Sequence, residues 1–480
     1  MTVRVGDAAQ APEFLSASKE QLANGQMRRN VRHATDVIRA KRNRIVGEMP
    51  DWESLRESAR QIKEHTLRNL DIYLEQFEKG CTQAGGKVHW AKDADEANSI
   101  ITGIIQSHGE KEVIKIKTMT SDETRLNPAL ETAGIIPYET DLADLIVQLG
   151  NDKPSHIVVP ALHRNRTEIR QLFIQKMKLE NLGDRPEDLT NAARSYLREK
   201  FLRVKVGIGG ANFAVAETGS VCIVESEGNG RMCLSLPQVF ISLVGIEKII
   251  PKFSDLEVFL QLLPRSATGE RMNPYNSIWT GVTANDGPQE FHVVLLDNGR
   301  SHILADEKNR QTLQCIRCGA CLNVCPVYRQ TGGHAYGSIY SGPIGAIVTP
   351  QLQSMQHSQS LPFASSLCGA CYEACPVKIN IPEVLIQLRN KVVENGDSPF
   401  VERVSMKAAS FALSDASHLS LAQNVGRIAQ QPFVRNGKIQ KLPGFLGGWT
   451  ESRNLKAVPK ESFRQWWAKR NKEKRKKENA

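Results

Sequence analysis

The stretch CIRCGACLNVCP at residues 315–326 and its partial copy SLCGACYEACP at residues 366–376 decide how this chain is interpreted. The first stretch has four cysteines in the spacing C-x2-C-x2-C-x3-C-P, and the second has three in the spacing C-x2-C-x3-C-P. Three thiolates at such spacings let one short loop reach three corners of a cube, while small residues between them let the backbone approach closely. The pattern is typical of ligands for paired iron–sulfur clusters.

The proline after the last cysteine of each motif turns the chain away, so each motif is expected to lend that thiolate to the other site. This crossing predicts a first site with four thiolates and a second with three. The predicted iron ligands are Cys315, Cys318, Cys321 and Cys375 at the first site, and Cys325, Cys368 and Cys371 at the second. Ser365 stands where a ferredoxin would carry an eighth cysteine. We predict a [4Fe-4S] cluster at the first site. At the second we predict either a [4Fe-4S] cluster with a non-cysteine fourth ligand or a [3Fe-4S] cluster.

Zinc is the alternative metal for CxxC pairs. A zinc site closes with four ligands and needs neither the triple cysteine run nor the cysteine–proline pairs, so the motifs favour iron–sulfur clusters. Cys81, Cys222 and Cys233 fall outside the motifs and are predicted to be small buried apolar side chains.

The bulk composition is that of a globular protein. At 480 residues the chain has room for about three domains. No run approaches the ~18 apolar residues of a membrane span, and the first residues do not resemble a signal peptide. Ten cysteines without an export signal indicate metal or redox chemistry and a cytoplasmic location. The net charge of +10 gathers in basic clusters, but no recognisable module predicts nucleic-acid binding.

The chain reads as four segments. The amphipathic pattern of residues 53–80 predicts one helix that ends at Gly80. From Gly86, strands alternate with helices, which predicts an α/β layer with a mostly parallel sheet, and HIVVPA at 156–161 is taken as one of its strands. Asn380 and Pro382 open a predicted helix after the second motif. The predicted divisions are a basic helical arm at 1–65, the α/β domain at 66–300, the two-cluster segment at 301–395, and a C-terminal region with a basic tail at 396–480.

Three separated segments resemble the LutB family of iron–sulfur proteins of bacterial lactate utilisation. They are GANFAVAETGSV at 210–221, HAYGSIYSGPIGAIVTP at 334–350, and FRQWW at 463–467. The resemblance implies an α/β LUD domain similar in fold to the NagB/RpiA/CoA-transferase superfamily. It also implies an α-helical, ferredoxin-like two-cluster domain and a mostly helical, family-specific C-terminal region. The seven motif cysteines match the cluster ligands of the family, including the absent eighth.

The resemblance further implies electron transport in a complex that oxidises L-lactate to pyruvate and allows growth on lactate. The implied partners are a cysteine-rich protein and a smaller LUD-domain protein. A quinone is the expected electron acceptor. Peripheral contact with the inner face of the membrane is left open. Because no flavin or nicotinamide fingerprint is visible, we expect a non-catalytic electron-transfer subunit. Two alternatives remain: the LUD domain is itself a 2-hydroxy-acid oxidoreductase with the clusters as its electron outlet, or the chain is a cluster-bearing redox sensor.

No catalytic residue is assigned from the sequence. The glycine-rich stretch at 207–220 is either a tight turn or a loop that presents backbone amides to a small carboxylate or phosphate. Under the second interpretation its candidate pocket residues are Asn212, Glu217, Thr218 and Ser220. Further candidates for binding a carboxylate follow apparent strands, where α/β sheets place ligand sites, and they are Arg125, His163 and Arg164.

Overall fold

The structure is a computed structural model and describes residues 13–353, 355–395 and 400–478. The chain divides into two compact units, Met1–Asn395 and Gly396–Ala480. The predicted boundaries at residues 65 and 300 fall inside the first unit and stay predictions.

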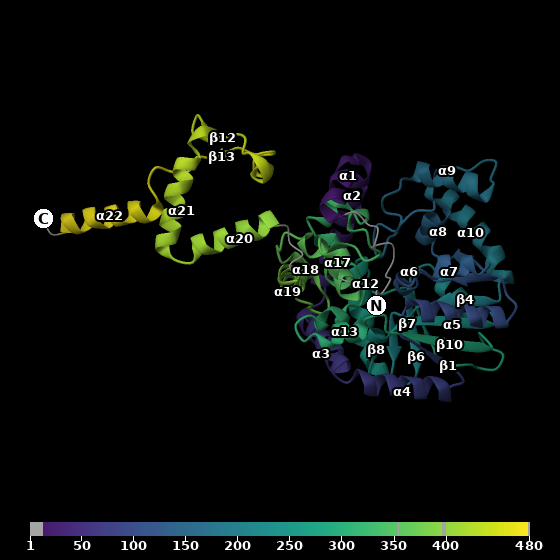
Figure 1. The fold of residues 1–480 in the computed structure, drawn as a ribbon. Coiled ribbons are helices and arrows are strands. Elements are labelled where there is room, and N and C mark those ends of the chain that lie inside the picture. Colours follow the sequence, from purple (N-terminus) through teal and green to yellow (C-terminus); the bar gives the residue numbers. More distant parts are fainter. Residues whose placement is uncertain (1–12, 354, 396–399, 479–480) are drawn as a thin grey trace. The chain divides into compact units, whose positions relative to one another are not determined.

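A six-stranded parallel sheet forms the centre of the first unit (Figure 1). Its strands lie in the order β1–β10–β7–β4–β2–β3. Their bounds are β1 Lys87–Ala91, β10 Glu290–Leu296, β7 Val239–Gly245, β4 Val206–Gly209, β2 Glu112–Lys115 and β3 Ile136–Glu139. The α/β layer with a mostly parallel sheet that the strand–helix alternation predicts is therefore confirmed.

Successive side chains of a strand point to opposite faces of the sheet. Both faces of this sheet are covered by packed elements, as is usual for parallel sheets. Phe240 and Phe291 pack in one core with Phe77 of α4 (Leu70–Gln83). On the other face, Ile241 and Val294 pack with helices α5 (Ala94–Ser107) and α7 (Leu126–Thr132). The buried runs of β7 and β10 follow from this coverage.

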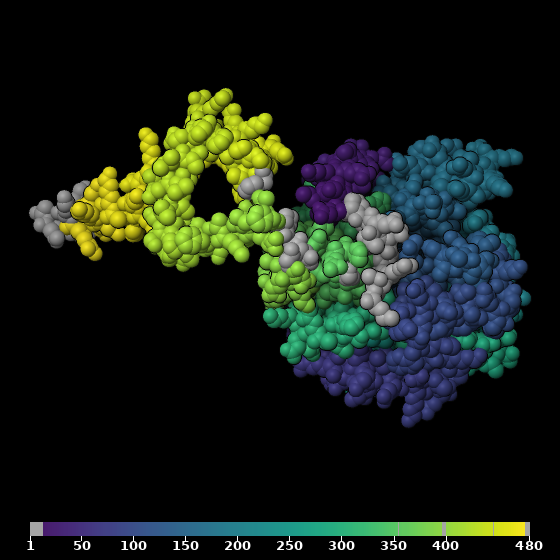
Figure 2. Space-filling model, in the orientation of Figure 1, coloured from purple at the N-terminus to yellow at the C-terminus, as the bar shows by residue number. Residues whose placement is uncertain are grey.

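A second, four-stranded sheet has the order β8–β5–β6–β9 and mixes parallel and antiparallel pairs. Its strands are β8 Ile249–Ile250, β5 Phe213–Val215, β6 Ser220–Glu225 and β9 Tyr275–Trp279. The other helical elements up to residue 305 are α1 Phe14–Ala23, α2 Gly25–Gly47, α3 Trp52–Arg68, α6 Met119–Glu123, α8 Leu142–Leu149, α9 Arg166–Met177, α10 Pro186–Arg203, α11 Asn229–Ser235, η2 Ile246–Lys248, η3 Phe253–Asp255, α12 Leu256–Ala267 and α13 Arg300–Ala305. Figure 2 shows α1 on the surface of this unit.

Short helices carry the chain through both cysteine motifs. They are η4 Arg310–Gln314, α14 Ala320–Val324, α15 Tyr328–Thr331, η5 His334–Tyr336, α16 Gly342–Leu352, α17 Met355–Ser358, η6 Leu361–Phe363, α18 Ala370–Ala374 and α19 Ile381–Glu394. The predicted start of α19 is confirmed, since the Asn380 side chain accepts a hydrogen bond from the Glu383 amide at 3.3 Å.

Two local predictions are wrong. The helix predicted over 53–80 breaks at Asn69, whose side-chain amide donates to the His65 carbonyl at 2.9 Å and so occupies the acceptor that its own backbone would have used. The second helix then continues through Gly80, where a side chain would lie 2.9 Å from the Gly219 amide, so this glycine permits close packing and does not stop the helix.

The predicted strand at 156–161 is a loop. His156 Nδ1 accepts hydrogen bonds from the amides of Val158 (3.0 Å) and Val159 (3.1 Å), and the backbone turns around the imidazole in place of pairing with the sheet.

The second unit is mostly helical. It contains α20 Phe400–Leu413, α21 Ala416–Ala429, η7 Gln431–Phe433, η8 Gly444–Trp449, α22 Phe463–Glu478 and a small antiparallel sheet of β11 Val434–Arg435, β12 Lys438–Ile439 and β13 Leu455–Lys456. Among the side chains described in 400–478, only Gln430 and Ile439 are buried.

Candidate iron–sulfur site

The two cysteine motifs adopt the same backbone course. Arg317 and Leu367 have φ of 60° and 54°, and Gly319 and Gly369 have φ of 73° and 84°. Each glycine precedes a five-residue helix, α14 or α18. At Gly319 the positive φ favours glycine, and a side chain there would also lie 3.1 Å from Val158. The spacing that the motifs share therefore produces a shared local geometry.

The last cysteine of each motif leaves its short helix in an extended conformation. Cys325 follows α14 with ψ of 120°, and Cys375 follows α18 with ψ of 119°. Helices α14 and α18 contact each other, which brings the two motifs side by side. Both final cysteines are thus carried out of their own loops beside the neighbouring motif.

The effects of the thiols on one another's pKa divide them into two sets. Besides burial, Cys315 and Cys375 raise the pKa of Cys318 and of Cys321, whereas Cys368 raises the pKa of Cys325 and of Cys371. Cys321 also interacts with Cys371, so the two sets are adjacent. The first set is Cys315, Cys318, Cys321 and Cys375, and the second set is Cys325, Cys368 and Cys371. This grouping supports the crossed assignment, which stays a prediction about the ligands.

Burial makes five of the seven thiols poor anions without a metal. It raises the pKa of Cys371 to about 12 and that of Cys375 to about 11, and it also raises the pKa of Cys318, Cys321 and Cys325. Coordination to a metal centre removes the thiol proton and makes such burial tenable.

Backbone amides already point at the sulfur atoms. The amide of Arg317 lies 3.4 Å from Cys315 Sγ, that of Tyr328 lies 3.5 Å from Cys325 Sγ, and that of Ile379 lies 3.3 Å from Cys375 Sγ. Near the same sulfurs, Arg42 Nε and the Tyr336 hydroxyl are buried and have no hydrogen-bond partner in the described part of the chain. Donors without acceptors around buried thiols fit a sulfide-rich anionic group, so these residues can hold iron–sulfur clusters.

The spacing of the sulfurs does not suit a single zinc ion. Two sulfurs on one zinc lie within about 4.6 Å of each other, twice the ~2.3 Å Zn–S distance. Among residues 13–353, 355–395 and 400–478, the only group of three or more Cys, His, Asp or Glu ligand atoms within 4.8 Å of one another is Asp152, His163 and His334. The cysteines are more widely spaced than zinc requires, which favours the larger cluster.

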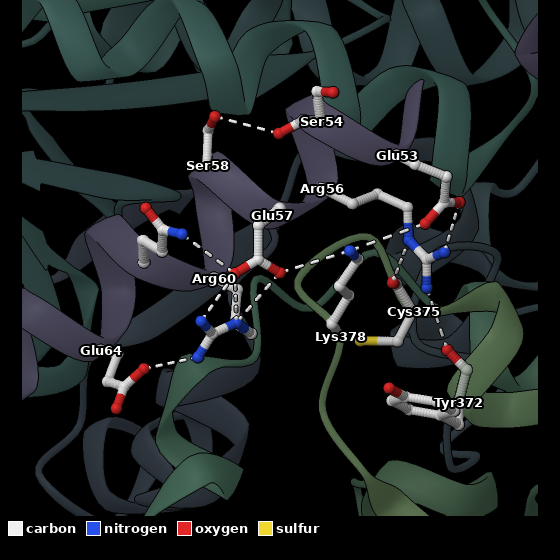
Figure 3. Close-up of polar contacts among 11 residues, drawn as sticks. Glu53, Ser54, Arg56, Glu57, Ser58, Arg60, Glu64, Tyr372, Cys375 and Lys378 are labelled. Carbon is white, nitrogen blue, oxygen red and sulfur yellow. Dashed lines mark hydrogen bonds and ion pairs between the residues drawn. The ribbon is translucent and has the colours of Figure 1, made fainter. Parts of the chain in front are cut away.

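An arginine of α3 holds the loop that supplies Cys375 (Figure 3). Arg56 donates from Nε to the Cys375 carbonyl at 2.9 Å and from NH2 to the Tyr372 carbonyl at 3.1 Å. On the same helix, Glu57 accepts from Lys378 of this loop at 3.3 Å. These contacts join parts of the sequence more than 300 residues apart. No spacing pattern in the sequence indicates such distant partners.

A buried ion network supports the first motif from the sheet side. Arg317 lies 3.5 Å from Glu247 and stacks over the Tyr340 ring at 4.5 Å. Glu247 also pairs with Arg300, which binds Glu123 at 2.7 and 2.9 Å. Despite its burial, the positive charges of Arg300, Lys248 and Arg317 lower the pKa of Glu247 to about 2. The sequence signal for this network is weak: Glu247 and Arg300 are charged residues that follow strands β7 and β10 within a few positions.

Each set has one thiol nearer to solvent, and that of the second set is the more exposed. Cys368 is exposed and Cys315 is half-buried, whereas the other five motif cysteines are buried. Ser365 Oγ accepts a hydrogen bond from the Leu367 amide at 3.1 Å, the counterpart of the Arg317 amide on Cys315 Sγ. The serine therefore occupies the matching backbone position, with an oxygen in place of the sulfur.

The other sequence candidates are engaged in local structure. Cys81, Cys222 and Cys233 are buried, as predicted. Asn212 accepts from the Val224 amide at 2.9 Å, Glu217 accepts from the Phe253 amide at 2.8 Å, and Thr218 bonds Ser220 at 2.7 Å. His163 and Arg164 both bind Asp152, while Arg125 directly precedes α7. The pocket assignments for these residues stay predictions.

Comparisons with known proteins show which families the chain is similar to. The chain matches the family models of the LUD domain at residues 74–296, of the 4Fe-4S dicluster domain at 311–379, and of the C-terminal region of lactate utilisation protein B at 386–472. The dicluster match indicates an iron–sulfur cofactor.

Full-length relatives are also similar. Lactate utilization protein B of Bacillus subtilis is 44% identical, with 100% of both chains covered, and that of Bacillus velezensis is 44% identical, with 99% of both covered. A solved DUF162 family protein from Deinococcus radiodurans aligns with 47% of this chain and 98% of its own at 12% identity and a TM-score of 0.28. Within the described residues, no helix has the length and apolar character that crossing a membrane requires.

Proposed function

The chain belongs to the lactate utilisation protein B family, and we propose that it is the iron–sulfur electron-transfer subunit of a complex that oxidises L-lactate to pyruvate. The observation that carries the proposal is the grouping of seven thiols from two motifs into two adjacent sets. When bound, paired clusters supply single-electron transfer, which links a two-electron oxidation to a one-electron acceptor.

We assign a [4Fe-4S] cluster to the first set. We assign a [4Fe-4S] or a [3Fe-4S] cluster to the second set, whose missing thiolate corresponds to Ser365. The amides of Arg317 and Ile379 and the guanidinium of Arg42 offset the negative charge of the first-set thiolates. The exposed Cys368 marks the edge where a partner can approach closely. In this proposal the cysteine-rich protein and the small LUD protein of the complex are the partners, and a quinone takes the electrons.

The test is a cysteine replacement in the assembled complex. Cys321→Ala should lower the iron and sulfide content by about half and abolish lactate-dependent reduction of the complex. Cys222→Ala, a buried cysteine outside both motifs, should change neither. Lactate-dependent reduction that is unchanged in the Cys321→Ala complex would overturn the proposal.

A second assay separates the carrier from an enzyme. The purified chain is incubated with L-lactate and an artificial electron acceptor, without partner proteins. A carrier gives no turnover, whereas turnover by the chain alone would assign the oxidation to its own LUD domain.

A further inference from the structure

A second constellation of ligand-type side chains lies apart from the cysteines. Asp152, His163 and His334 each place one ligand atom within 4.8 Å of the others. The first two belong to the loop between α8 and α9, and the third belongs to η5 between the cysteine motifs. They line a cavity of about 230 Å³ that also reaches the ends of α1 and α2. All three are partly buried, and none is a ligand in the cluster assignment.

His334 has one ring nitrogen committed to the backbone. Its Nε2 lies 2.9 Å from the Lys153 carbonyl. A carbonyl oxygen only accepts, so Nε2 carries the hydrogen and donates it. The neutral ring therefore keeps its lone pair on Nδ1. A hydrogen bond from the opposite nitrogen to a carbonyl is the usual support of a metal-binding histidine.

His163 is supported in the same way. Its Nδ1 lies 2.8 Å from Ser155 Oγ, and that hydroxyl has the Pro160 carbonyl as its own acceptor at 3.0 Å. With the serine turned to Pro160, Nδ1–H donates to Oγ. Nε2 lies 2.9 Å from Asp152 Oδ2, and because a carboxylate oxygen only accepts, Nε2 donates its hydrogen to Asp152 in this structure. A metal ion at this position displaces that proton and is then shared by Nε2 and the carboxylate.

Asp152 is held in place by other donors. Its Oδ1 accepts from the Lys153 amide at 2.7 Å, and its Oδ2 accepts from Arg164 at 2.6 and 3.1 Å. Arg164 is the one positive side chain among the residues that line the cavity, and Asp152 and Glu168 are the negative ones. Once the Nε2 proton of His163 is released, both histidines are neutral and the lining carries a formal charge of −1, which an added cation offsets.

We propose that Asp152, His163 and His334 bind a divalent transition-metal ion. Two imidazoles and one carboxylate suit zinc or iron(II), and three protein ligands leave positions for water or a small oxyanion from the cavity. The site shares no ligand with the clusters and stands independently of the electron-transfer role.

The experiment uses the full chain, purified anaerobically with its clusters intact and oxidised. It is dialysed against zinc chloride, and zinc and iron are counted by mass spectrometry. One zinc per chain should bind without loss of iron. His334→Gln and His163→Gln should each weaken zinc binding by at least about 100-fold, more than the loss of an outer-shell partner costs. His302→Gln, an exposed histidine of α13, should not change the affinity.

X-ray absorption at the zinc edge separates this site from zinc held by cysteines. The proposed site gives only nitrogen and oxygen neighbours near ~2.0–2.1 Å, whereas zinc at the motifs gives sulfur at ~2.3 Å. Sulfur coordination, the absence of bound zinc, or zinc affinity unchanged in both histidine variants would overturn the proposal. The iron count shows that each variant keeps its folded cluster region.

Discussion

The first and second cysteine motifs have nearly the same backbone but different surroundings. Both place a glycine with positive φ before a five-residue helix, and both release their last cysteine in an extended conformation. The first motif, however, packs against a buried ion network, while the second exposes Cys368 and has Ser365 in place of a thiol. The cysteine spacing determines the backbone conformation of each motif. Segments distant in the sequence determine the burial and the charges around it, which affect the properties of a bound cluster.

The largest expected difference between the two sets is their resistance to oxygen. Brief exposure of the protein to air should remove about half of the iron, and the second site should lose it first, because Cys368 is exposed. Iron analysis with EPR follows the loss. Cys371→Ala, which removes a second-set thiol, should eliminate the fast phase, whereas Cys321→Ala should leave only that phase. Loss of iron from both sites at one rate would contradict the comparison.

Matched positions in the two motifs should differ in their effect on folding. Arg317→Ala removes a side chain that is only 9% exposed and pairs with Glu247, and it should lower the free energy of unfolding by about 3 kcal/mol. Leu367→Ala, at the equivalent and 36% exposed position, should cost less than about 1 kcal/mol. Anaerobic guanidinium unfolding followed by circular dichroism measures both. Equal costs would mean that the surroundings of the two motifs do not differ in energy.

Removing the contacts of α3 with the Cys375 loop should lower the free energy of unfolding by a smaller amount, and the loss should depend on which arginine of α3 is replaced. Arg56→Met loses two charge-assisted hydrogen bonds to carbonyls and should cost about 2–3 kcal/mol. Arg60→Met, on the same helix, loses only ion pairs with Glu57 and Glu64 at the surface and should cost less than about 1 kcal/mol. The same unfolding assay applies, and the reverse order would refute the role given to Arg56.

The smallest expected effect is a pH dependence from His156, whose Nε2 bonds Asn323 of α14 at 3.2 Å. Burial, aided by the charge of Lys117, lowers the pKa of His156 from 6.5 to about 4. Between these two pKa values the unfolded chain binds a proton that the folded chain does not bind. The free energy of unfolding therefore falls as the pH drops from about 6.5 toward 4. Between pH 7 and 5.5 the loss should be about 1 kcal/mol. Unfolding at both pH values should show a weaker pH dependence in His156→Asn and an unchanged one in the exposed control His302→Asn.

Structural features that depend on residues close together in the sequence could be predicted from the sequence. The cysteine spacing, the helix that starts after Asn380 and the parallel sheet were predictable, because motif spacing, a capping side chain and buried apolar runs are local signals. The break at Asn69 and the loop at His156 were not, since each depends on a side chain that competes for backbone hydrogen bonds. The partners Arg56 and Glu247 come from distant segments, which only the folded chain brings to the motifs.

The central claim is that the last thiolate of each motif belongs to the other motif's site. Crystals of the anaerobic protein, with anomalous diffraction recorded at the iron edge, locate both iron centres and their sulfur ligands directly. The account predicts that Cys375 Sγ bonds the centre held by Cys315, Cys318 and Cys321, and that Cys325 Sγ bonds the centre of Cys368 and Cys371. A map in which Cys375 instead shares its iron with Cys368 and Cys371 would contradict it.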